Sequence, residues 1–338
     1  MRRPLAARAG AALAAAAFAG VALAPAAADT APPDRRCLGF ASNEDARSLT
    51  VFDACRDAAL AEIPVPGRPR GLVVSRDGTR LYVALSDRER QQQGSEDAVL
   101  ALALPGLAEV GRYDAGSDPE VVDVTPDGTR LFAANEDAGT ATATDVASAR
   151  PLATLVVGIE PEGVAVSPDG RVVYVTAETS STVTAIDAAS LQVVASFLVD
   201  PRPRAAAFSP DGRRAFVTAE IGGSVAAVDA VAHRVIGTVA LGEDAKPVGV
   251  VVSPDGATVY VALGHAGRVA VVDAAALRVR AQVRVGRRPW GLALSRDGRK
   301  LYTANGGSGD VSVVDTRSLQ VVATVRAAAG TWGVALVP

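Results

Sequence analysis

The chain has few of the residues that build reactive sites. Its 338 residues include two histidines, two cysteines and one methionine, and Phe, Tyr and Trp together make up 4%. Two histidines, His233 and His265, are too few for a histidine-rich metal centre, and we predict no metal site. Neither cysteine lies in a C-x-x-C or C-x-x-C-H context, so thioredoxin-like redox chemistry and covalent haem attachment are not indicated.

Long apolar runs are confined to the N-terminus. Three arginines within the first eight residues precede an Ala-rich apolar stretch that ends near Leu23, and residues 26–28 offer an A-x-A cleavage site. We therefore predict that residues 1–28 are a secretory signal peptide, cleaved after Ala28, and that the protein is periplasmic or secreted. An uncleaved membrane anchor is the alternative, although alanine is weakly apolar for a bilayer span. After cleavage we expect no membrane span.

The mature chain lacks the positive charge that general binding to phosphate backbones or anionic lipid requires. Residues 1–28 carry three arginines and no acid, which leaves 31 basic and 37 acidic residues and a net charge of −6. Nucleic acid is therefore not an expected partner. A local basic patch is still compatible with this balance.

Turn signals recur at nearly constant spacing along the chain. The pattern S/T-P/R-D-G recurs at steps of 50, 42, 42, 44 and 42 residues, and ends at Gly78, Gly128, Gly170, Gly212, Gly256 and Gly298. A period near 42 fits a four-stranded propeller blade or a helical repeat of HEAT type. Alternating β-branched segments such as VSVVDT favour strands, and glycine supplies the positive φ that closes a tight D-G hairpin.

Each repeat divides into four strands, a to d, and seven repeats predict an all-β, seven-bladed β-propeller over residues 37–338. The first repeat begins at Cys37 without a strand a, and the last strand a, residues 332–337, has no blade after it. We therefore predict that the C-terminal strand completes the N-terminal blade and closes the ring, after a short segment at residues 29–36. Strand b carries an aromatic residue in every repeat, for which we expect a place in the core: Phe40, Tyr82, Phe132, Tyr174, Phe216, Tyr260 and Tyr302.

Two further features belong to the scaffold. If the first hairpin turns around Ala46, Cys37 and Cys55 face each other, and the even cysteine count of an exported chain favours a disulfide over two free buried thiols. Strand c ends in Asp in every repeat except the second, where Ala103 replaces it. We expect these carboxylates to accept backbone N–H bonds in the c–d turn rather than to form a catalytic ring.

One position varies while the frame around it repeats. The start of strand a and the end of strand b lie on one face, and strand a is innermost, so the residues there surround the mouth of the channel. The predicted site for a ligand or partner comprises Arg68, Arg70, Glu120, Glu162, Arg202, Arg204, Lys246, Arg288, Trp290, Trp332, Glu136, Glu178, Glu220 and His265. The same positions also hold Glu44, Asp118, Glu160 and Arg287. Arginines beside tryptophans suit a flat anion or an acidic protein surface; alternatively, Arg and Glu of adjacent blades pair and simply close the ring.

The repeat resembles the YVTN family of β-propellers, named after its strand-b sequence, which here reads YVTA at 174–177 and YTAN at 302–305. Stretches such as VGIEPEGVAVSPDG are similar, more specifically, to the β-propeller proteins associated with catabolism that depends on pyrroloquinoline quinone (PQQ). The resemblance covers nearly all of the mature chain and implies a seven-bladed exported protein that accompanies periplasmic alcohol oxidation. It supplies no catalytic residues, and the chain departs from the pattern at Ala103 and in a polar insertion within residues 86–97.

These observations lead us to expect a non-enzymatic, monomeric binding or scaffold protein that serves periplasmic PQQ-dependent alcohol oxidation. Its partner would be a protein, such as a periplasmic dehydrogenase, or a small anionic ligand at the mouth, and no cofactor is firmly predicted. A sharper hypothesis is that PQQ itself binds there, its three carboxylates meeting basic side chains and its plane stacking on Trp290 or Trp332. One alternative is a propeller lactonase or other hydrolase, in which Glu136, Glu178 and Glu220 supply a base or bind Ca²⁺. Single-stranded nucleic-acid binding is the other alternative.

Overall fold

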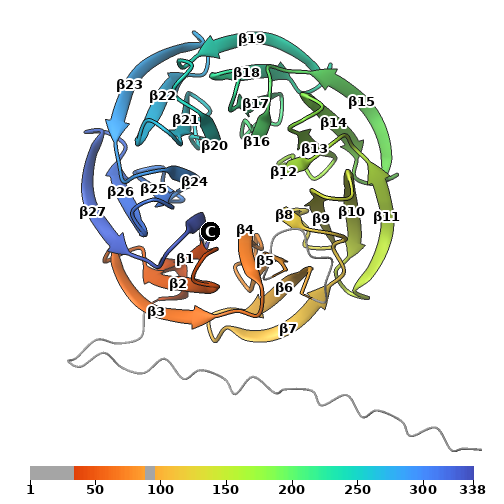
Figure 1. Ribbon diagram of the computed structural model, residues 1–338, viewed down its shortest axis with the longest axis horizontal. Helices are drawn as coiled ribbons and strands as arrows, with labels where there is room; N and C mark the ends of the chain where they lie inside the picture. Colours follow the sequence, from red (N-terminus) through yellow and green to blue (C-terminus); the bar gives the residue numbers. More distant parts are fainter. Residues whose placement is uncertain (1–33, 88–95) are drawn as a thin grey trace, which may run out of the picture.

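Seven sheets of four strands stand around a central channel in the computed structural model, which describes residues 34–87 and 96–338 (Figure 1). The first strand of each sheet is innermost and the fourth lies at the rim. The predicted seven-bladed all-β propeller is confirmed. The predicted signal peptide and most of the insertion at 86–97 lie outside the described residues, so these two expectations stay predictions.

Blade 1 combines both ends of the chain, and blades 2 to 7 follow in chain order. Blade 1 consists of β28 (Thr331–Leu336), β1 (Leu38–Asn43), β2 (Ser48–Asp53) and β3 (Ala58–Pro64), and the short 3-10 helix η1 (Arg35–Cys37) precedes β1. Blade 2 consists of β4 (Arg68–Val74), β5 (Arg80–Ser86), β6 (Ala98–Ala103) and β7 (Ala108–Tyr113). Blade 3 consists of β8 (Pro119–Val124), β9 (Arg130–Asn135), β10 (Thr140–Asp145) and β11 (Arg150–Val156).

The remaining four blades repeat the same pattern. Blade 4 consists of β12 (Pro161–Val166), β13 (Val172–Ala177), β14 (Thr182–Asp187) and β15 (Gln192–Leu198). Blade 5 consists of β16 (Pro203–Phe208), β17 (Arg214–Ala219), β18 (Ser224–Asp229) and β19 (Arg234–Ala240). Blade 6 consists of β20 (Pro247–Val252), β21 (Thr258–Leu263), β22 (Arg268–Asp273) and β23 (Arg278–Arg284). Blade 7 consists of β24 (Pro289–Leu294), β25 (Lys300–Asn305), β26 (Asp310–Asp315) and β27 (Gln320–Arg326).

The ring closes through the C-terminal strand. β28 pairs antiparallel with β1, with Phe40 opposite Ala335, while β1 pairs on its other side with β2. This closure, which the sequence predicts, leaves no gap between the first and last blades and removes the exposed sheet edges of an open array.

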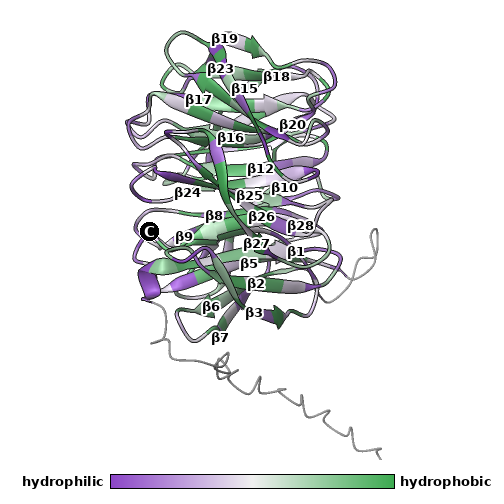
Figure 2. Ribbon diagram, turned by 90° about the vertical axis from the view of Figure 1, so that its left-hand side faces the viewer, coloured by the Kyte–Doolittle hydropathy of each residue, from purple (hydrophilic) through white to green (hydrophobic). Residues whose placement is uncertain are grey.

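The core lies between neighbouring blades. The seven strand-b aromatics are at most 5% exposed, as predicted for a core ring. Tyr174 of blade 4 contacts Phe208 of blade 5 with ring centroids 4.8 Å apart, and Tyr302 of blade 7 contacts Phe52 of blade 1 at 5.6 Å. Seen from the side, the strands carry most of the hydrophobic residues and the loops at the two faces are more hydrophilic (Figure 2). In the described part of the chain, no helix has the length and apolar character needed to cross a membrane.

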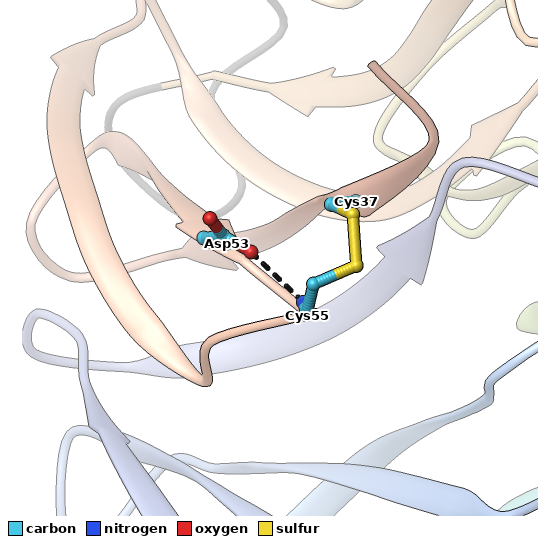
Figure 3. A group of neighbouring side chains, drawn as sticks. All are labelled: Cys37, Asp53 and Cys55. Atoms are coloured by element: carbon cyan, nitrogen blue, oxygen red, sulfur yellow. Dashed lines mark hydrogen bonds between the residues drawn. A yellow bond between two sulfur atoms is a disulfide. The ribbon is translucent and has the colours of Figure 1, made fainter. Parts of the chain in front are cut away.

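A disulfide joins Cys37 to Cys55, as predicted (Figure 3). The predicted pairing of the hairpin was wrong by one residue, however, because Leu38 lies opposite Asp53 and the carbonyl of Cys37 accepts a bond from Ala54. The bridge still forms because Cys55 is the next residue along the chain. Asp53 accepts the N–H of Cys55 at 2.9 Å, the turn role that we predicted for the aspartates at the end of strand c.

Candidate functional site

A bulge at the start of strand a sets the variable residue apart from the sheet. In blades 2 to 7 a buried proline is the first or second residue of strand a, and the pairing register shifts directly after it. In blade 4 the shift falls between Pro161 and Gly163, so Glu162 has no partner in the ladder. A bulge of this kind redirects a side chain, here towards the mouth of the channel. The glycine allows close approach of the next blade, since a Cβ on Gly163 would lie 2.4 Å from the carbonyl oxygen of Arg204.

The loops around the mouth are fixed by their backbone. The residue that precedes the proline is left-handed, with φ between 49° and 63°, in blades 3 to 7: Asp118, Glu160, Arg202, Lys246 and Arg288. Its carbonyl accepts the N–H of the residue that follows strand b, as in Glu136 to Asp118 at 3.0 Å and Glu178 to Glu160 at 2.9 Å. The charged side chains of the mouth therefore project from a rigid frame.

One cluster of opposite charges spans blades 1, 2 and 3. Arg68 donates to Glu44 at 2.7 Å and to Asp118 at 3.3 Å. Arg70 donates to Glu44 at 2.8 Å and makes two bonds to one oxygen of Glu120, whose side chain is fully buried. Each of these bonds crosses from one blade to the next, so the cluster fastens the inner ends of three blades together.

A second cluster spans blades 4 and 5. Arg204 donates to Glu162, to Glu178 at 2.8 Å and to Glu220 at 2.6 Å. Arg202 reaches Glu178 at 2.9 Å and lies 3.3 Å from Glu220, but its side chain is 38% exposed, against 10% for Arg204. The alternative prediction, that Arg and Glu of adjacent blades pair, holds for both clusters.

Two indole rings lie between the clusters. Trp290 and Trp332 have ring centroids 6.0 Å apart, and the Arg70 guanidinium lies 5.2 Å from the Trp332 ring. The guanidinium carbons of Arg288 and Arg204 lie 5.0 and 5.5 Å from the Trp290 ring. Both tryptophans thus serve as neutral surfaces for cations, and both stay partly exposed.

Burial raises the pKa of two carboxyl groups at the mouth, Glu120 and Glu162. It raises the pKa of Glu120 to about 8, although the charge of Arg70 acts in the opposite direction. Burial, together with the Glu120 carboxylate, raises the pKa of Glu162 to about 8 as well. Burial alone would lower the pKa of Arg70, but Glu120 and Glu44 outweigh it and the pKa rises above its usual range. The arginine therefore stays charged, while the two glutamates titrate near neutral pH.

Beside the second cluster, a cavity of about 670 Å³ opens at the mouth of blades 5 to 7. Its wall carries six cations, Arg202, Arg204, Lys246, Arg284, Arg287 and Arg288, together with Glu220, His265 and Trp290. Among residues 34–87 and 96–338, no carboxylate lies within 4.0 Å of the charged group of Lys246, Arg284, Arg287 or Arg288. The cavity thus combines an excess of positive charge with one aromatic plane.

Carboxylates gather on the other side of the mouth, at blades 3 and 4. Oxygens of Asp118, Glu120 and Glu136 lie within 4.8 Å of one another, and so do oxygens of Glu136, Glu160 and Glu178. Neither group contains histidine or cysteine, so the donors are of the kind that hard cations such as Ca²⁺ take.

The structure divides the predicted site residues between these regions. The cavity brings together Arg202, Arg204, Glu220, Lys246, His265, Arg288 and Trp290. Outside its wall lie Arg68, Arg70, Glu120, Glu136, Glu162, Glu178 and Trp332. Sequence reasoning missed Arg284 at the end of β23, although the end of strand d reaches the same face as the mouth and could have signalled it.

Comparisons with known proteins support the fold. A family model described as the cytochrome D1 heme domain matches residues 215–333, about a third of the chain. No curated protein matches. Hydrazine synthase from Kuenenia stuttgartiensis is 23% identical, with a TM-score of 0.74 over 84% of this chain and 94% of that one.

Two further solved structures have the same shape. A protein of unknown function from Desulfotomaculum acetoxidans is 20% identical, with a TM-score of 0.75 over 88% of this chain and 98% of that one. A protein from Bacteroides fragilis, proposed to be a 6-phosphogluconolactonase, is 17% identical, with a TM-score of 0.72 over 90% and 99%. At these identities the likeness extends to architecture alone, and the chain is a seven-bladed β-propeller.

Proposed function

We propose that this protein is a non-enzymatic binding protein that takes an anionic group into the cavity of blades 5 to 7. The observation that supports this most directly is the imbalance of charge in the cavity wall. Lys246, Arg284, Arg287 and Arg288 have no carboxylate partner among the described residues, whereas the mouth arginines of blades 2 and 5 are paired: Arg68, Arg70, Arg202 and Arg204. Four cations around one hollow repel one another, and an anion that enters relieves that repulsion.

The geometry of the wall favours a flat anion. Arg204 is held in place by three glutamates, and it lies with Arg288 against Trp290, which presents a partly exposed aromatic plane. Because these groups are already positioned, little conformational entropy is lost when a ligand binds. An acidic side chain or carboxyl terminus of a partner protein could occupy the same hollow.

The biological setting that we propose follows the resemblance to propellers of PQQ-dependent catabolism. An exported accessory of periplasmic alcohol oxidation would meet PQQ or an enzyme that contains it. PQQ is planar and has three carboxylates, so Lys246, Arg287 and Arg288 would hold it, and it would contribute quinone redox chemistry when bound. The disulfide of blade 1 is compatible with an oxidising compartment.

Haem suits this cavity less well. A haem iron needs an axial ligand from His, Cys, Met or Tyr. His265 is the one imidazole in the cavity wall, and its Nδ1 lies 3.3 Å from the carbonyl oxygen of Asp244 at the exposed rim. Both cysteines form the disulfide, and the strand-b tyrosines are buried between blades. The wall therefore fits the carboxylates of a ligand rather than an iron centre, and we propose no haem function.

The test is a calorimetric titration of the mature protein with PQQ, using Arg288→Ala and a matched control, Arg317→Ala, on the opposite face. Loss of one charged hydrogen bond should weaken binding at least tenfold in Arg288→Ala and leave the control unchanged. Binding that Arg288→Ala does not weaken would contradict the cavity as the site. If PQQ does not bind, capture of a periplasmic dehydrogenase with the same two variants tests the protein-partner form.

A hydrolase remains the second candidate, supported by the raised pKa of the Glu120 and Glu162 carboxyls at the mouth, which is a property of acid–base groups. Both side chains are buried and bound by arginine, and the described residues show no paired nucleophile and base beside them. Hydrolysis of a lactone that Glu162→Gln abolishes would favour this candidate.

A further inference from the structure

The carboxylates on the acidic side of the mouth, at blades 3 and 4, lie outside the anion cavity. Two groups of carboxylates, each within 4.8 Å, share Glu136 as a common member. Asp118, Glu120 and Glu136 extend from blade 3, while Glu160 and Glu178 extend from blade 4. Five carboxylates therefore form one continuous row across the junction of these blades.

Arginine neutralises only part of this row. Asp118 pairs with Arg68, Glu120 with Arg70, and Glu178 with Arg202 and Arg204. Across the described ranges, no lysine or arginine lies within 4.0 Å of Glu136, which stands where the two groups meet. The four arginines of both clusters face eight carboxylates: Glu44, Asp118, Glu120, Glu136, Glu160, Glu162, Glu178 and Glu220.

One carboxylate of this row has an oxygen atom without a hydrogen-bond donor. Oε1 of Glu120 has no hydrogen-bond partner in the part of the chain that the structure describes, and the side chain is 0% exposed. A buried oxygen without a donor is costly, so an absent ligand is a direct explanation.

Asn135 of the same blade repeats this feature. Its Oδ1 is buried and unpartnered, whereas the equivalent Oδ1 atoms of Asn43 and Asn305 accept hydrogen bonds from threonine hydroxyls. Ser117 also has a buried, unpartnered hydroxyl at this end of blade 3. Blade 3 therefore differs from blades 1 and 7, where a threonine hydroxyl satisfies the equivalent asparagine oxygen.

We propose that Asp118, Glu120 and Glu136 form a binding site for a divalent cation, and that Ca²⁺ fits it best. Calcium takes oxygen ligands at about 2.3–2.6 Å, so two ligands on opposite sides of one ion lie about 5 Å apart. The separation of 4.8 Å or less falls within that range. Magnesium is less suitable because it requires about 2.0–2.1 Å and strict octahedral geometry.

The site would act on the ring rather than on the anion cavity. Glu136 also belongs to the group that includes Glu160 and Glu178, so an ion bound by Glu136 would place positive charge beside the carboxylates of blade 4. This junction lies between the two arginine clusters and has no interblade ion pair of its own among the described residues. Calcium would therefore reduce the repulsion between the carboxylates of blades 3 and 4 at this junction.

The experiment is a calorimetric titration of the metal-free mature protein with Ca²⁺ at pH 8, with Mg²⁺ as a second titrant. The variant is Glu136→Gln, and the matched control is Glu243→Gln, an exposed carboxylate in the loop between β19 and β20. We expect Ca²⁺ to bind more tightly than Mg²⁺, and to bind at least tenfold more weakly to Glu136→Gln. The control should bind within twofold of the parent.

Three results would overturn the proposal: no saturable Ca²⁺ binding, equal effects of the two variants, or binding that Glu136→Gln leaves intact. Thermal unfolding guards against a folding defect, because Glu136→Gln should unfold at the midpoint of the metal-free parent and no longer respond to Ca²⁺. If the row is neutralised by shared protons instead, Glu136→Gln will raise the midpoint and Ca²⁺ will not change that of the parent, which also rejects the site. PQQ binding is measured separately, so failure here leaves the anion cavity untouched.

Discussion

The two sides of the channel mouth contain the same types of basic residue, but these residues are paired with carboxylates on one side and unpaired on the other. On blades 1 to 5, Arg70 and Arg204 lie among glutamates and are only 12% and 10% exposed. On blades 6 and 7, Lys246 and Arg288 line an open cavity and have no carboxylate partner among the described residues. Pairing turns the first set into part of the scaffold, while the second set lines the cavity in which we propose that an anion binds. The contrast also holds at one repeat position, because Arg68 and Arg288 both directly precede the strand-a proline, yet Arg68 is paired with Glu44 and Asp118 while Arg288 lines the cavity.

Removing a paired arginine should have the largest effect. At pH 9, above the pKa of Glu120, Arg70→Ala would leave that fully buried carboxylate without its cation, and we expect a loss of about 3–5 kcal/mol in the free energy of unfolding. Denaturant unfolding of the mature protein measures this directly.

Arg288→Ala is the matched control for that experiment, since it removes an arginine from the unpaired side. It should change stability by less than about 1 kcal/mol. Equal losses in Arg70→Ala and Arg288→Ala would mean that pairing does not distinguish the two sides.

A partly buried carboxylate of the channel wall, Asp123, provides a second test, because no cation pairs with it among the described residues. Asp123 of β8 accepts the N–H groups of Val124 and Val166, both at 2.8 Å, and burial raises its pKa to about 6 in spite of these bonds. Its pKa is higher in the folded than in the unfolded chain, so its stabilising effect is complete below about pH 4 and is lost as the pH rises through about 6.

Asp123→Ala should remove this pH dependence. Alanine occupies the same position in blades 4 and 5, as Ala165 and Ala207, so the side chain fits the wall. The difference in unfolding free energy between variant and parent should shift by on the order of 2–3 kcal/mol between pH 3.5 and pH 7.5. A difference that is constant with pH would show that Asp123 does not titrate in this range.

The repeat explains why most of the fold could be predicted. The strand-b aromatic occurs seven times, and the D-G turn and the terminal strand-c aspartate six times each, all at fixed places in the frame, so the copies confirm one another. The same frame is sufficient to assign Arg70, Glu120 and Trp290 to the mouth of the channel. The repeat position of a residue predicts its place within a blade, and the order of the repeats predicts the place of that blade around the channel.

Contacts between blades could not be predicted in the same way. Glu44 accepts bonds from both Arg68 and Arg70, across the junction that ring closure creates, and nothing in the spacing specifies which side chains reach each other. Arg284 was missed for a similar reason, because it reaches the cavity from the rim strand β23, whereas the other cations of the wall belong to the predicted mouth positions. The hairpin of Cys37 shows the limit within one blade, where a turn of unknown length shifted the pairing by one residue.

The smallest predicted effect tests whether solvent exposure, rather than the identity of the partner, determines how much an ion pair contributes to the free energy of unfolding. Arg202 and Arg204 share Glu178 and Glu220, but the Arg202 side chain is 38% exposed. Solvent screens that interaction, so Arg202→Ala should cost less than about 1 kcal/mol, while Arg204→Ala should cost several times more. Unfolding of both variants under one buffer condition gives the ratio. Similar losses would mean that the shared glutamates, and not the burial of the arginine, determine the energy of the ion pair. The structural side of the mouth would then be defined by the presence of a carboxylate partner and not by burial.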